Sequence, residues 1–180
     1  MATPKLTPGQ IIQVSGLVAD YISSQRQKYA PRAVPLSSRE RAAVSAFFAP
    51  ELLDNTRLLL LEGERVSNPA FYAMLRDLGF TNLPDQSTMA AITFCDVVVS
   101  HERFSNPLLF HELVHAEQYR QLGIPRFAEL YVRGFLSGGG YESIPLEKIA
   151  YSLEDCFRRE PHRGFSVEKE VARWAAEGRL

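Results

Sequence analysis

A helix that buries two histidines and a glutamate is the strongest constraint on how this chain of 180 residues can fold. Residues 107–116 carry apolar side chains at helical spacing, and His111, Glu112 and His115 lie among them. Because residues four apart share one face of a helix, both imidazoles can reach a single metal ion, with Glu112 beside them. Without such an ion, the three polar groups would be costly to desolvate. The pattern therefore predicts a metal site on a half-buried helix.

A zinc ion held by two histidines needs a third protein ligand and an open position for water. The sequence predicts a later helix over residues 145–154, with Glu147 in its first turn. Ala150 shares a face with Glu147 and would leave room for the motif helix to approach. We therefore predict Glu147 as the third ligand. The alternatives are Glu154 and Glu142, of which Glu142 lies in the glycine-rich loop before this helix.

The rest of the chain predicts a helix-rich α+β fold. Amphipathic spacing and capping signals predict helices over residues 8–29, 37–50, 69–78 and 107–122, the last with Asn106 as its cap. Val167, Val171, Trp174 and Ala175 predict a packing helix at the C-terminus, after a polar connection in which His162 is solvated. Residues 56–62 predict a short strand, and residues 89–100 one long strand or a tight hairpin.

These elements suggest one globular domain with two parts. Residues 86–180 are expected to form the metal-binding core, with a small antiparallel sheet or hairpin before the motif helix. Residues 1–85 are expected to be a mainly helical N-terminal part that packs on this core and is not an independent domain.

Composition argues against several classes of partner. The net charge of −1, from 20 basic and 21 acidic residues, leaves no electrostatic footprint for nucleic acid or an anionic membrane. The apolar runs are too short to span a bilayer, and the N-terminal stretch lacks the apolar core of a signal peptide. Cys95 and Cys156 are far apart and outside any CxxC pair. We expect no membrane span, and a protein that is cytoplasmic or exported without a visible signal peptide.

The motif and the later Glu-x-x-Ala resemble the gluzincin zinc metallopeptidases, in which two histidines and a glutamate bind zinc. A closer likeness is to small bacterial metallopeptidase-like domains of extracellular contractile injection systems and related uncharacterised proteins. This likeness extends over about residues 90–151, and Gln118 stands where those domains also have a glutamine. The segments that carry it are residues 91–93, 109–119, 139–141, 145–147 and 150–151. The resemblance implies a zincin-like fold of the minimal gluzincin type. Residues 1–85 match no family.

The implied mechanism is hydrolysis of a peptide or protein substrate. One Zn²⁺ would be held by His111, His115 and Glu147, and would activate a water molecule. Glu112 would act as general base: it takes a proton from the water and passes it to the leaving amine.

Two further roles stay open at this point. The oxyanion needs a donor besides zinc, and Tyr141, Tyr151 and His101 are the candidates. Glu154 or Asp155 is expected to accept a hydrogen bond from a metal-bound histidine.

Two other readings compete with a peptidase. A zinc-binding interaction or assembly module with little or no catalysis would keep the metal site and use the N-terminal part as a docking surface. An HExxH helix without any metal is the third reading. The sequence determines neither the substrate specificity nor the oligomeric state.

Overall fold

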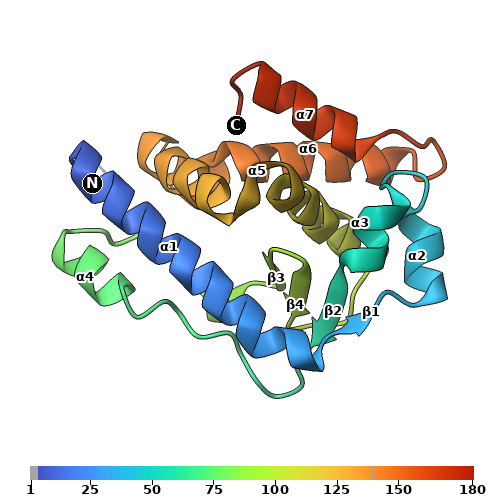
Figure 1. Cartoon of the computed structure of the whole chain (residues 1–180), viewed down its shortest axis with the longest axis horizontal. Helices are drawn as coiled ribbons and strands as arrows, with labels where there is room; N and C mark the ends of the chain where they lie inside the picture. Colours follow the sequence, from blue (N-terminus) through green and yellow to red (C-terminus); the bar gives the residue numbers. More distant parts are fainter. Residues whose placement is uncertain (1–3, 139) are drawn as a thin grey trace.

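The computed structural model describes residues 4–138 and 140–180, so residues 1–3 of the N-terminal stretch and Gly139 of the glycine-rich loop lie outside the described part. The chain forms a helix-rich α+β fold, as predicted (Figure 1). Its strands are β1 (Val34–Pro35), β2 (Arg57–Leu60), β3 (Ala91–Phe94) and β4 (Val97–Ser100). Its helices are α1 (Pro8–Tyr29), α2 (Ser38–Val44), α3 (Pro50–Asn55), α4 (Tyr72–Asp77), α5 (Asn106–Gly138), α6 (Pro145–Arg159) and α7 (Val167–Ala176), with 3₁₀ turns η1 (Ala30–Arg32), η2 (Gln86–Thr88) and η3 (Tyr141–Ser143).

The strands form one mixed sheet in the order β1-β2-β4-β3. Residues 89–100 fold as the tight hairpin of the two forms considered, and β3 pairs antiparallel with β4. The antiparallel hairpin expected before the motif helix is therefore present, but it belongs to a larger mixed sheet, because β2 pairs with β4 in parallel. A parallel pair needs a crossover of a dozen or more residues, and the segment 61–96, which includes α4, η2 and β3, supplies it.

The motif helix α5 begins one residue earlier than predicted. Ser105, not Asn106, is its cap, because the Ser105 hydroxyl accepts a hydrogen bond from the Leu108 N–H (3.3 Å) and the Ser105 carbonyl from the Leu109 N–H (2.9 Å). The predicted end near residue 122 corresponds to a kink at Gly123, whose backbone is non-helical (φ 71°, ψ 163°). The kink divides α5 into a first arm, residues 106–122, and a second arm, residues 124–138.

Two short helices differ from the prediction because of contacts elsewhere. The predicted helix over residues 37–50 ends at Val44, since the Phe47 carbonyl accepts the Val167 N–H at 3.0 Å and Pro50 starts a helix of its own. The predicted helix over residues 69–78 begins at Tyr72, because its first turn is tighter: the Tyr72 N–H donates to the Pro69 carbonyl.

The helices enclose two apolar clusters that meet along α5. The first arm packs with α2, α6 and α7, where Phe110 stacks on Phe157 with 4.5 Å between ring centroids. The second arm packs against α1, which runs past the hairpin (Figure 1). In α7, Val167 and Val171 are buried as predicted, whereas Ala175 is exposed. The HExxH segment is therefore surrounded by the buried apolar side chains of the helices that pack on α5.

Other expectations concern the surface of the protein. Over residues 4–138 and 140–180, the helices lack the combination of length and apolar composition that crossing a membrane requires. Cys95 is half-buried, Cys156 is exposed, and both are free. His162 is exposed, as predicted.

The kink at Gly123 yields a stability prediction. Its φ and ψ lie in a region that non-glycine residues hardly adopt, so Gly123→Ala is expected to lower the free energy of unfolding by about 1–3 kcal/mol. Gly16→Ala is the matched control: Gly16 lies inside α1 and an added Cβ would meet nothing within 4 Å, so this change should stabilise by about 0.5–1 kcal/mol. Urea unfolding measures both, and equal effects would contradict the assignment of the kink.

Candidate metal centre

Three buried ligand atoms converge where the first arm of α5 meets α6. His111 Nε2 lies 3.2 Å from His115 Nε2, and Glu147 Oε2 lies 3.6 Å from His111 Nε2 and 3.4 Å from His115 Nε2. The two imidazoles come from successive turns of α5, and the carboxylate from the first turn of α6. All three side chains are buried, so the structure brings together the three residues that were predicted as ligands.

Hydrogen bonds on the far side of each ring determine which nitrogen faces this point. Gln118 Nε2 donates to the Leu146 carbonyl (2.9 Å), so its Oε1 faces His115 and accepts from Nδ1–H (2.9 Å). His111 Nδ1 lies 3.0 Å from Glu154 Oε2. An ionised carboxylate can only accept a hydrogen bond, so His111 Nδ1 carries the hydrogen and donates it. In their neutral forms, both histidines therefore turn the lone pair of Nε2 inward, the tautomer that ligates a metal.

The cluster attracts positive charge. Burial lowers the pKa of His111, but the carboxylates of Glu147 and Glu154 outweigh burial and raise this pKa to about 10. Burial opposes charge on His115 too, yet Glu147 raises its pKa. Burial raises the pKa of Glu147, but the two histidines hold it well below its usual range. A proton or a metal cation can supply the charge that these groups favour.

The spacing of the three atoms fits a tetrahedral metal site. Bonds of about 2.0–2.1 Å at tetrahedral angles place neighbouring ligand atoms about 3.3–3.4 Å apart. The three observed separations, from 3.2 to 3.6 Å, bracket this value. Glu147 Oε2 is also a buried atom with no hydrogen-bond partner in the described part of the chain. A buried, unpartnered carboxylate oxygen is costly, and a metal ion would satisfy it.

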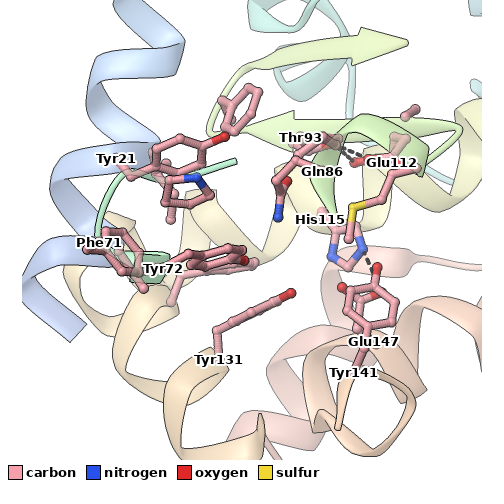
Figure 2. A pocket seen from close by; sticks show the side chains of 18 residues that line it. Tyr21, Phe71, Tyr72, Gln86, Thr93, Glu112, His115, Tyr131, Tyr141 and Glu147 are labelled. Atoms are coloured by element: carbon pink, nitrogen blue, oxygen red, sulfur yellow. Dashed lines mark hydrogen bonds and ion pairs between the residues drawn. The ribbon is translucent and has the colours of Figure 1, made fainter. Parts of the chain in front are cut away.

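Glu112 lies beside this group, on the edge of a cavity of about 100 Å³. Glu112, His115 and Glu147 all line that cavity (Figure 2). The Thr93 hydroxyl, from β3, donates to Glu112 Oε2 at 2.6 Å and so fixes the orientation of the carboxylate. The predicted general base and two of the ligands therefore face the same space, which has room for several water molecules.

The structure distinguishes among the candidates that the sequence left open. Tyr141 lines the cavity, and Tyr151 covers the His111 ring with 4.6 Å between centroids. His101 lies outside the site: its Nε2 accepts from the Val66 N–H (3.0 Å) and its Nδ1 contacts the Met89 carbonyl (2.6 Å). Both ring nitrogens of His101 therefore have structural partners.

The acidic alternatives also separate. Glu142 is exposed and does not belong to the converging group. Glu154 accepts a hydrogen bond from His111, which is the supporting role predicted for Glu154 or Asp155. Its other oxygen, Oε1, accepts a hydrogen bond from Arg158 Nε at 2.7 Å. Asp155 is exposed and pairs with Arg159 instead.

Sequence reasoning missed the roles of three residues at this site. Thr93 bonds Glu112, Gln118 fixes His115, and the side chain of Tyr131 points into the cavity from the second arm (Figure 2). Gln118 could have been found, because it lies three residues after His115 on the same helical face. Thr93 left a weaker signal, a polar side chain in an otherwise apolar strand. Tyr131 left none.

The role of Glu154 can be tested against its neighbour. Glu154→Ala removes the acceptor that orients His111, so zinc affinity is expected to fall about 10–100-fold. Asp155→Ala, one residue away on the same helix, removes an exposed carboxylate and should leave the affinity unchanged. Competition with a chelating dye measures both constants. Equal affinities for the two variants would show that Glu154 does not support the site.

Comparisons with known proteins add no relative. A scan against protein-family models, a search of curated proteins and a search of solved structures each found no match. The conclusion about the site therefore depends on its own geometry. This geometry is a buried group of His111, His115 and Glu147 that can bind a metal ion.

Proposed function

We propose that this protein is a zinc-dependent peptidase with a zincin-like fold of the minimal gluzincin type. One observation carries the proposal: the ligand atoms of His111, His115 and Glu147 converge in the core, and Glu112 shares a cavity with two of these residues. A metal without an adjacent base, or a base without a metal, would support a weaker conclusion.

The donor set favours zinc over other metals. Two imidazoles and one carboxylate are ligands that zinc takes in catalytic sites with three protein ligands. Calcium and magnesium prefer oxygen ligands, and thiolate-loving ions would need cysteine. The resemblance of the HExxH motif and the later Glu-x-x-Ala to gluzincins supports the same metal.

Zinc bound at this site would supply a Lewis acid that lowers the pKa of a coordinated water molecule. The protein's own part in proton transfer falls to Glu112. Its Oε2 accepts the Thr93 hydroxyl at 2.6 Å, and the carboxylate faces the cavity. Glu112 takes the proton from the attacking water and delivers it to the amine of the broken peptide bond.

Two tyrosines can stabilise the negative charge that develops on the substrate carbonyl. Tyr141 and Tyr131 line the cavity with Glu112 and Glu147 (Figure 2). Burial, followed by the negative charge of Glu147, raises the pKa of both hydroxyls, so each stays protonated and able to donate. A neutral donor aimed at developing charge is the usual device of such sites.

A peptide substrate fits the strand that borders the cavity. β3 lies at the end of the sheet order, and Ala91, Ile92 and Thr93 line the cavity. In an antiparallel pair, backbone groups point alternately to and away from the partner, so those of Ala91 and Thr93 face away from β4. An extended peptide can add to such an edge through main-chain hydrogen bonds.

A zinc-binding assembly module without useful proteolysis is the second candidate. The observation in its favour is the closure of the site: His111 and His115 are each only 6% exposed, and Tyr151 covers one ring. A site this enclosed admits little substrate unless its walls move.

The metal and its third ligand are tested together. After dialysis against zinc, the wild type is expected to hold about one zinc ion per chain by elemental analysis. Glu147→Ala should hold far less, because the unpartnered oxygen is lost. Glu142→Ala should bind as the wild type does, because that carboxylate is exposed and outside the group. A zinc-free wild type would rule out the proposed function.

Catalysis is tested by Glu112→Gln in the zinc-loaded protein. The variant keeps the size of the side chain and all three ligands, so it should retain zinc but lose at least about 100-fold in peptide cleavage. Glu102→Gln, a change at an exposed glutamate, is the control and should leave cleavage intact. If wild type and Glu112→Gln are equally inert on a broad peptide library while both hold zinc, the module is the correct function.

A further inference from the structure

A second, smaller cavity lies behind the one at the candidate metal centre. The metal-side cavity, of about 100 Å³, reaches Glu112, His115 and Glu147, whereas the rear cavity, of about 50 Å³, has a lining that is apolar apart from two tyrosines. Four residues line both cavities and form a partition between them: Val18, Phe71, Tyr72 and Tyr131. Figure 2 shows Phe71 and Tyr72 across the metal-side cavity from His115 and Glu147.

The lining of the metal-side cavity selects against negative charge. Its charged groups are Glu112 and Glu147, which belong to the catalytic and metal group, and most of the other walls are aromatic or aliphatic. A carboxylate that entered would lose its hydration and meet these two acidic groups, whereas an apolar side chain would gain from leaving water against the aromatic and aliphatic walls. An apolar group therefore suits this cavity better than an anionic one.

The partition sets an upper limit on size. A closed cavity of about 150 Å³ accommodates one benzene molecule. The metal-side cavity is smaller, at about 100 Å³, so a side chain of about the size of leucine fits it and a single ring is the upper limit. A larger group would meet the rings of Phe71 and Tyr72, although empty space lies beyond them.

We infer that the metal-side cavity receives a large apolar side chain of the substrate residue next to the scissile bond, and that the partition, with Phe71 as its main member, excludes anything larger than one ring. This inference rests on the proposed function, because the metal group anchors the substrate at one end of the cavity. It adds the substrate class and a residue that determines specificity. Val18, Tyr72 and Tyr131 complete the same wall.

Hydroxamic acids test the inference without requiring catalysis. The probes share one zinc-binding group and differ in the acyl chain: acetyl, 4-methylpentanoyl, 3-phenylpropanoyl, 3-(2-naphthyl)propanoyl and 3-carboxypropanoyl. For the zinc-loaded wild type, the 4-methylpentanoyl and phenylpropanoyl probes are expected to bind at least about tenfold more tightly than the acetyl, naphthyl and carboxyl probes. Isothermal titration calorimetry measures each dissociation constant.

Phe71→Ala should join the two cavities and improve binding of the naphthyl probe about tenfold relative to the 4-methylpentanoyl probe. Val18→Ala removes less of the same partition and should shift the probe preference in the same direction, by a smaller factor. It replaces Phe71→Ala in the test if that variant does not fold. Leu75→Ala is the matched control, because Leu75 lines the rear cavity alone and its loss leaves the partition intact. Its probe preference should equal that of the wild type.

The outcomes separate this inference from the proposed function. Zinc-loaded protein that binds all five probes equally would overturn the inference and leave the metal centre standing. Equal shifts for Phe71→Ala and Leu75→Ala would overturn the role of the partition. A protein that takes up no zinc would overturn the proposed function and the inference with it.

Discussion

Two imidazoles and a carboxylate meet in the core between α5 and α6, and the surrounding structure is arranged to make their burial tolerable. Each group loses hydration, so each needs a partner inside the protein. Gln118 and Glu154 satisfy the outer nitrogens of the rings, while the inner nitrogens and Glu147 Oε2 are left facing one another. Phe110 and Phe157, stacked nearby, hold the two helices together. The fold thus concentrates unsatisfied lone pairs at one point, and apolar packing elsewhere in the core offsets the free-energy cost of burying them.

The parts of this site that could be predicted are those that depend on residues close to one another in the sequence. A four-residue spacing fixes two imidazoles on one face of a helix wherever that helix lies. Glu147 follows from the first turn of a helix whose start is marked by a proline, and the hairpin before the motif follows from its β-branched residues. These features depend on neighbours within a few positions, so tertiary structure had little opportunity to alter them.

The parts that could not be predicted depend on segments far apart in the chain. The parallel pairing of β2 with β4 joins residues about 40 positions apart, and no local pattern specifies it. The early end of α2 depends on Val167, which reaches the carbonyl of Phe47 from the far end of the chain. The hydrogen bond from Thr93 to Glu112 and the position of Tyr131 depend likewise on how β3 and the second arm are placed around the first arm.

Apart from Glu112, His115 and Glu147, the residues around the cavity come from different segments than the residues that would hold the metal. Its walls are drawn from α1, the stretch around Phe71, η2, β3 and the second arm, whereas the ligands and their supporting groups lie on the first arm and α6. Substitutions in the walls can therefore reshape what fits without disturbing the hydrogen bonds that fix the imidazoles. The volume beside the cluster and the geometry of the three ligand atoms are thus set mostly by separate stretches of the chain, and one can change while the other is kept.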